Sequence, residues 1–208
     1  MPVSRPKIQV RRGSVGDIPL LVRHRTGMHR ELPPFAPSRV LREHERTYRR
    51  WLGQNLPPGQ VIALIAEDGM GHPMGSGCVW FYTDHPRPGI GVAETAYLMS
   101  MFTEPAFRRI GVASRLVREA IRTARGRGCP RMVLHAAPMA RELYPTFGFE
   151  RTWEMRIWLE PRLRRAHRHS DAVDPAAPRA AGPRSAKGRR VGPRKDPRPR
   201  RRIRRRTP

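Results

Sequence analysis

The sequence predicts a mixed α/β domain in which helices flank a central, mostly antiparallel sheet. Apolar runs with strand character alternate with segments of helical periodicity in the order β-α-α-β-β-β-α-β-α-β. The links among the three middle strands have hairpin length, which favours antiparallel pairing. A helix between the later strands requires a crossover, which favours parallel pairing. Together these observations predict a mixed sheet.

The first strand is expected at residues 8–12, where apolar and polar residues alternate. A helix should follow, with Asp17 as its N-cap and Pro19 in its first turn. The residues expected on its inner face are Leu20, Leu21, His24 and Met28. Prolines at 33–37 end this helix, and a second is expected at 38–52. Its apolar positions are Val40, Leu41, Tyr48, Trp51 and Leu52.

Three strands come next, at residues 61–67, 75–82 and 94–103, separated by turns rich in glycine, proline and aspartate. Residues 108–127 have the strongest helical periodicity in the chain. Their apolar positions are Ile110, Val112, Ala113, Leu116, Val117, Ala120, Ile121 and Ala124.

The end of the domain is predicted to contain a strand at 131–136, a short helix at 139–147 that stops at Gly148, and a last strand at 149–159. Residues Trp153, Met155, Ile157 and Leu159 recur at every second position and should share one face of this last strand.

Composition divides the chain into a folded domain at 1–160 and a basic tail at 161–208. The tail contains 18 Arg or Lys against three acidic residues and accounts for +15 of the formal charge of +25. Its large apolar residues are only Leu163, Val173, Val191 and Ile203. Such a segment cannot bury enough apolar surface to offset the entropy of ordering, so we expect disorder.

Residues 198–206 of the tail contain seven arginines. Such a run binds polyanions by releasing counterions, so it could tether the protein to nucleic acid. A solvated tail without a selected partner and a poorly constrained extension from GC-rich codons stay open beside that interpretation.

Two cysteines, Cys78 and Cys129, are too few for a disulfide framework and fit a reducing compartment. Residues 1–10 contain no apolar segment typical of a secretory signal, and the apolar run at 61–66 is too short to span a membrane. We therefore expect a soluble, cytoplasmic protein. The histidines and cysteines lack metal-ligand spacing, so no metal is predicted.

An anion site is predicted where the strand at 94–103 leads into the long helix. Gly111 opens that helix and has no Cβ, so a phosphate could approach the backbone there. Amides at a helix start lack partners and carry partial positive charge. Arg108 and Arg109 add cationic donors.

This motif, Arg108-x-x-Gly111-x-Ala113, is followed about 30 residues later by a second one. The second consists of Leu143, Tyr144, Gly148 and Phe149. In their order and spacing, the two resemble the pyrophosphate motif and the later Leu-Tyr…Gly-Phe signature of the GNAT superfamily of N-acetyltransferases. The resemblance covers about residues 8–159.

The resemblance implies a GNAT-type sheet that is splayed between the strand before and the strand after the coenzyme-binding helix. Acetyl-CoA would insert there as the acetyl donor. The backbone of Met101, Phe102 and Thr103 would pair with the pantetheine amides. The pyrophosphate would be held by Arg108 and by the backbone amides of Arg109, Ile110, Gly111, Val112, Ala113 and Ser114.

Tyr144 would stand near the thioester sulfur and protonate the departing thiolate, because a phenol is protonated at neutral pH. The implied reaction is direct acetyl transfer to a primary amine, without a covalent enzyme intermediate. A different acyl donor, such as succinyl-CoA, stays open, as does a homodimer. A competing interpretation is an inactive acyl-CoA fold whose basic tail binds nucleic acid.

The general base and the acceptor are not predicted. Glu94, Ser100, Glu104 and His135 are candidates for the base, each with a structural role as the alternative. Acceptor selection is expected from residues 20–52 and 83–91, which lie outside the two motifs. Their neighbourhood offers four aromatic residues that could line a pocket or simply fill the core: Phe35, Trp51, Trp80 and Tyr82.

Overall fold

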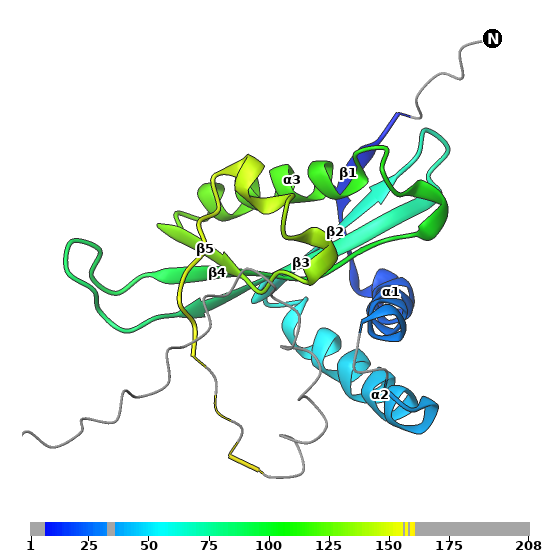
Figure 1. Cartoon of the computed structure of the whole chain (residues 1–208), viewed down its shortest axis with the longest axis horizontal. Coiled ribbons are helices and arrows are strands. Elements are labelled where there is room, and N and C mark those ends of the chain that lie inside the picture. The colour runs from blue at the N-terminus through cyan, green and yellow to red at the C-terminus, as the bar shows by residue number, and fades with distance from the viewer. Residues whose placement is uncertain (1–6, 33–35, 156, 158, 161–208) are drawn as a thin grey trace, which may run out of the picture. The chain divides into compact units, whose positions relative to one another are not determined.

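A mixed five-stranded sheet forms the centre of the protein (Figure 1). The structure is a computed structural model that describes residues 7–32, 36–155, 157 and 159–160. Its strands, in sheet order as well as chain order, are β1 (Gln9–Arg12), β2 (Val61–Glu67), β3 (Pro73–Thr83), β4 (Glu94–Thr103) and β5 (Arg131–Leu134). The first three pairings are antiparallel and the β4–β5 pairing is parallel. The predicted mixed sheet is confirmed.

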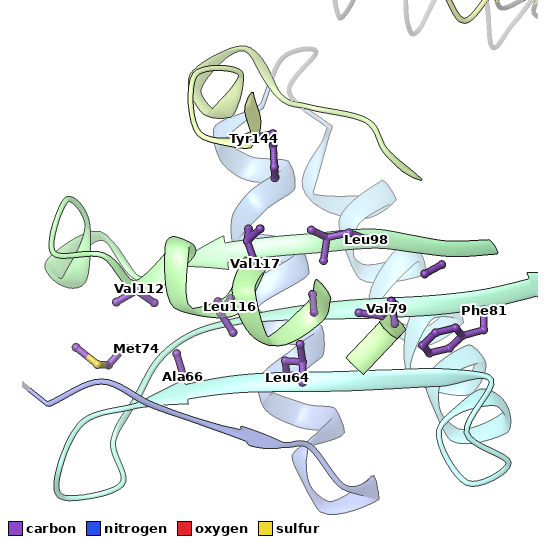
Figure 2. Packing of buried hydrophobic residues seen from close by; sticks show 13 residues of the cluster. Leu64, Ala66, Met74, Val79, Phe81, Leu98, Val112, Leu116, Val117 and Tyr144 are labelled. Atoms are coloured by element: carbon purple, nitrogen blue, oxygen red, sulfur yellow. The ribbon is translucent and has the colours of Figure 1, made fainter. Parts of the chain in front are cut away.

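Helices cover both faces of the sheet (Figure 1). Helices α1 (Ile18–Glu31) and α2 (Ser38–Asn55) lie on one face, and α3 (Val112–Gly126) lies on the other. Figure 2 shows Leu116 and Val117 of α3 pointing at sheet residues such as Leu64 and Val79. The α1/α2 face has a separate core, which includes Leu21, Leu52, Ala63, Ile65 and Cys78. Alternation along the strands sends successive side chains to these two cores.

Strands β4 and β5 pair only at their beginnings. Their register runs from Thr95 opposite Arg131 to Leu98 opposite Leu134. Strand β5 ends there, whereas β4 continues to Thr103. Among the described residues, 99–103 of β4 therefore have no strand partner on that side, which is the predicted splay.

An extra residue in β4 lies directly beyond the last pair. Cys78 of β3 faces Met99 and Ser76 faces Phe102, so three steps along β4 match two along β3. This is a β-bulge, and Ser100 within it has a φ of 55°. A left-handed conformation in a residue other than glycine costs roughly 1–3 kcal/mol and requires support from its surroundings.

Two glycines in β3 make room for the bulge. A Cβ on Gly77 would lie 2.4 Å from the Met101 sulfur, and one on Gly75 would lie 2.6 Å from the Phe102 carbonyl oxygen. Larger residues at either position would collide with β4, so these glycines determine how closely the two strands approach.

Several predicted elements differ from the structure. The expected helix at 139–147 is instead two short 3₁₀ turns, η3 (Pro138–Ala140) and η4 (Tyr144–Phe147). Pro145 explains this, because it lacks an N–H and would clash with the preceding helical turn. The expected strand at 149–159 is also wrong for its described residues, none of which pairs in the sheet. Trp153 and Met155 there are 85% and 96% exposed.

Other differences are smaller. Helix α3 begins at Val112 rather than Arg108, after a short 3₁₀ turn, η2 (Pro105–Phe107). Val40 is half exposed, although α2 forms as predicted. Phe35 and the tail at 161–208 lie outside the described residues. Within the described ranges, no helix has the length and apolar character needed to cross a membrane.

Candidate functional site

Six consecutive backbone amides of the described chain lack a well-formed backbone hydrogen bond where β4 leads into α3. They are the N–H groups from Arg109 to Ser114, none of which donates such a bond to a carbonyl oxygen of the described residues. The next amide, that of Arg115, donates to the Gly111 carbonyl at 3.0 Å and begins the helical pattern. A row of free amides at a helix start can bind an anion, as the sequence predicts.

The conformation of this loop depends on two left-handed residues, Arg109 (φ 65°) and Gly111 (φ 98°). Gly111 is the N-cap of α3, and a Cβ built on it would meet nothing within 4 Å. The space beside Gly111 is therefore open to a ligand, and its backbone angle is one that other residues avoid.

The two arginines of the loop have different surroundings. Arg108 binds both carboxylate oxygens of Glu31 at 2.7 Å and donates to the Thr103 carbonyl at 3.1 Å, so it ties the loop to α1 and β4. Arg109 has no carboxylate within 4.0 Å among the described residues, so its guanidinium is available to an anion.

Beside this loop, a groove of about 300 Å³ separates α1 from the end of β4. Arg23, Arg30 and Glu31 line it from α1, and Phe102 and Glu104 from the other side. The groove therefore lies at the end of β4, beside the side chain of Phe102.

The unpaired edge consists of the predicted residues Met101, Phe102 and Thr103, together with the bulge before them. Met101 packs on the α3-side core, whereas Phe102 turns toward His24 of α1, with 5.2 Å between ring centres. All three residues are half-buried. With the side chains directed to the two faces, the backbone N–H and C=O groups point along the sheet, where an extended ligand could pair with them.

Tyr144 lies on the α3 side of the sheet, where Figure 2 shows its ring pointing from η4 toward the sheet. The residue is buried, and its ring packs edge-on against Phe149. Burial raises the pKa of the phenol above its usual value of 10.0. Its hydroxyl has no hydrogen-bond partner among the described residues. The hydroxyl is therefore protonated at neutral pH and available as a donor.

Two base candidates, Glu94 and Glu104, are held by other side chains. Arg127 binds Glu94 at 2.6 and 2.9 Å, and this hydrogen bond lowers the carboxyl pKa. Glu94 also lies at the paired end of β4, away from the splay. Glu104 accepts a 3.0 Å hydrogen bond from the buried His24, whose other nitrogen contacts Ser76, so Glu104 joins α1 to the end of β4.

His135 lies at the point where β4 and β5 separate, directly after the last paired residue of β5. Its Nδ1 is 2.7 Å from the Tyr97 hydroxyl, and its Nε2 contacts the Glu154 carboxylate. A carboxylate beside one ring nitrogen fixes the hydrogen there and leaves the lone pair on the other. This arrangement suits a general base.

The hydroxyl of Ser100 is held by residues from α1 and α2. Arg25 Nη1 donates to Ser100 Oγ at 2.6 Å, and the Tyr48 hydroxyl lies 3.1 Å from the same oxygen. The Arg25 guanidinium stacks over the Tyr48 ring at 4.7 Å, and its Nε donates to His44 Nε2 at 3.1 Å. These contacts support the left-handed conformation of the bulge.

A row of aromatic rings crosses the same face of the sheet. Neighbouring ring centres are 5.8 Å apart from Tyr48 to Trp51, 6.4 Å to Trp80 and 6.3 Å to Tyr97, and 5.5 Å from Tyr97 to His135. Trp51 and Trp80 pack on the α1/α2-side core and are also half exposed. They therefore serve the core and form a surface beside the splay.

Sequence reasoning missed Arg25, Tyr48 and the two β3 glycines as parts of the site. Gly75 and Gly77 carried a signal, since two glycines spaced by two within a strand indicate close approach of another backbone. Arg25 carried none, because its contact with Ser100 joins residues 75 positions apart. Among the described residues, no group of three or more His, Cys, Asp or Glu side chains is close enough to share a metal.

Comparisons with known proteins agree on one family. A family model described as Acetyltransferase (GNAT) family matches residues 25–149. No curated protein matches the chain. Among solved structures, a GCN5-related N-acetyltransferase from Ralstonia eutropha JMP134 has 26% sequence identity and a TM-score of 0.66, covering 74% of this chain and 99% of that one.

Two further solved structures share the fold. A predicted acetyltransferase with acetyl-CoA from Clostridium acetobutylicum has 23% identity and a TM-score of 0.64, covering 77% of this chain and 99% of that one. The aminoglycoside N-acetyltransferase AAC(6')-Iy in complex with CoA has 20% identity and a TM-score of 0.57, with the same coverage of both chains.

The half-buried His29 makes stability depend on pH. Burial, followed by the charges of Arg25 and His44, lowers its pKa from 6.5 to about 4. The unfolded state therefore takes up a proton before the folded state does. The stability from neutral His29 is complete above pH 6.5 and is lost as the pH falls toward 4, by at most about 1.4 kcal/mol per pH unit.

We expect His29→Phe, which keeps an aromatic ring but cannot titrate, to show a shallower fall in the free energy of unfolding between pH 6.5 and 4. Urea unfolding of both proteins across this range measures the difference. Parallel curves for the two proteins would contradict the pKa shift.

Proposed function

Because the chain belongs to the acetyltransferase (GNAT) family, we propose that it is an acetyl-CoA-dependent N-acetyltransferase that transfers the acetyl group directly to a primary amine. One observation carries the proposal: the free amides from Arg109 to Ser114 follow directly on the unpaired edge of β4. Acetyl-CoA has matching parts, because an extended amide-bearing arm joins its diphosphate to its thioester.

In this proposal the diphosphate binds the amides at the start of α3, where the helix dipole also favours negative charge. Arg109 adds a cation, and Arg108 holds the loop to Glu31. The pantetheine arm lies along Met101–Thr103 and pairs with their backbone as an added strand would. Its length brings the thioester to the splay, near Ser100, and leaves the α1/α2 face open for the acceptor.

In the reaction, the lone pair of the neutral amine attacks the acetyl carbonyl carbon. The carbon–sulfur bond then breaks, and the electron pair leaves on sulfur as the thiolate of CoA. Tyr144 donates its phenolic proton to that thiolate, and its raised pKa keeps the proton available at neutral pH. The products are the N-acetylated amine and CoA with a free thiol.

The amine must also lose a proton, and we propose His135 as the base. It lies at the splay with Glu154 beside Nε2 and the Tyr97 hydroxyl beside Nδ1. The proton passes through the Tyr97 hydroxyl to Nδ1, and the carboxylate of Glu154 stabilises the resulting imidazolium. Glu94 is less suitable, because the hydrogen bond from Arg127 lowers its pKa and makes it a weaker base.

We expect Gly111→Val to weaken acetyl-CoA binding at least about tenfold, because a β-branched residue disfavours the left-handed angle and would occupy the open space beside the amides. Titration calorimetry measures the affinity. The matched control is Gly126→Val, at the other end of α3, where the backbone angle is ordinary and the space equally open. Failure of the unchanged protein to bind acetyl-CoA would refute the proposed function.

We expect Tyr144→Phe to lower kcat roughly 10- to 100-fold while the KM for acetyl-CoA stays nearly constant, because only the proton donor is lost. The assay follows free thiol released from acetyl-CoA. The hydroxyl has no partner in the described chain, so the melting temperature should not fall. A variant with full kcat would remove Tyr144 from the reaction.

We expect His135→Gln to lower kcat about 100-fold or more and to leave acetyl-CoA affinity unchanged, because glutamine cannot accept the amine proton. His72→Gln, in the exposed β2–β3 turn, is the control and should keep full activity. A kcat within about twofold of the unchanged protein for both variants would show that another group is the base.

A further inference from the structure

We propose that the acceptor amine carries an anionic group, a carboxylate or a phosphate, which Arg25 binds on the α1/α2 side of the unpaired edge of β4. The inference rests on the proposed function, since it names the class of amine that the same site would acetylate. The guanidinium of Arg25 is half-buried, and all the groups that it contacts are uncharged.

Arg25 is held in a fixed orientation by three neutral groups. Its Nε donates to His44, its Nη1 donates to Ser100, and its plane stacks over Tyr48. Among the described residues, Nη2 and the second hydrogen of Nη1 have no hydrogen-bond acceptor, so they remain as donors. Such a fork matches the two oxygens of a carboxylate or phosphate.

Unlike Arg25, the other arginines that join elements of the fold are each paired with a carboxylate. Arg108 pairs with Glu31, Arg127 with Glu94 and Arg131 with Asp84. No carboxylate of the described residues lies within 4.0 Å of Arg25. An unmatched charge that is partly removed from water is unfavourable, so a ligand that supplies the opposite charge would be bound strongly.

The neighbouring histidines are neutral, so they add no second positive charge beside Arg25. His44 accepts a hydrogen bond from Arg25 through Nε2, which requires a neutral ring with its hydrogen on Nδ1. Burial and then Arg25 lower the pKa values of both His44 and His29, so both are neutral near pH 7. Glu45 is the acidic residue that acts on His44, and it lies beyond ion-pair distance of Arg25.

Arg25 is also close to the expected reaction centre. Its partner Ser100 lies two residues beyond Leu98, the last residue of β4 that pairs with β5. The rings of Tyr48, Trp51, Trp80 and Tyr97 continue from Arg25 toward His135 on the same face. An acceptor whose anion meets Arg25 would therefore lie along this aromatic surface, with its amine directed to the splay.

The test uses the full chain and thiol release from acetyl-CoA, with acceptors in matched pairs. One series compares glycine, β-alanine and 4-aminobutyrate with their carboxamides, and a second compares glucosamine 6-phosphate and phosphoethanolamine with glucosamine and ethanolamine. The first series identifies a carboxylate and the second a phosphate. We expect the anionic member of a pair to be preferred roughly 10- to 100-fold in kcat/KM, as for a charge-assisted hydrogen bond.

Arg25→Gln should abolish that preference, and Arg25→Lys should restore part of it. Arg49→Gln removes the same charge from the exposed surface of α2 and should leave the preference unchanged. A structural defect would lower kcat/KM equally for both acceptors of a pair. The ratio of the two kcat/KM values therefore reports on recognition of the anion alone.

Equal use of anionic and neutral amines, or an Arg25→Gln effect that is the same for both, would overturn the inference and leave the proposed function intact. If no amine of either series releases thiol although acetyl-CoA binds, both the small-amine acetyltransferase activity and the inference fail.

Discussion

The bulge that β4 carries at Ser100 is the feature on which the rest of the site depends. One extra residue interrupts the alternation of side chains, so Met99 and Ser100 both face α1 and α2 while Met101 turns to the α3 side. A bulge also increases the local twist and bends its strand. It lies directly after the last pair between β4 and β5, so the bend separates the strands and exposes the backbone of residues 99–103.

This strained conformation is stabilised from both sides of β4. On one side, Gly75 and Gly77 allow β3 to approach the bulge where larger residues would collide. On the other, Arg25 and Tyr48 hold the Ser100 hydroxyl. The same contacts that stabilise a left-handed serine therefore bring a cation and an aromatic ring to the edge where a ligand would bind. The residues of α1 and α2 that support the bulge are thus the same ones that the proposal assigns to substrate recognition.

The parts of the fold that the sequence predicted are those specified by local patterns. Strands β2 and β4 are found where apolar runs bounded by turns predicted them, and the amides at Gly111 follow from one glycine at the start of a periodic helix. The prediction failed at 149–159, because alternation of apolar residues shows that a strand could form and not that a partner edge exists. It also failed at 139–147, where the spacing of apolar residues outweighed the proline inside the segment.

The residues on the acceptor side of the proposed site could not be predicted from local patterns for a different reason. The chain has 42 Arg or Lys residues, so composition alone cannot distinguish a functional cation from a solvated one. The distinction comes from long-range pairing, as in Arg108 with Glu31, which are 77 positions apart, and Arg25 with Ser100, which are 75 apart. Where folding has already neutralised an arginine, the residue stabilises structure. Where it has left an arginine half-buried among neutral groups, as with Arg25, the proposed acceptor supplies the missing charge, and the chemistry of that acceptor follows from what the protein leaves unpaired.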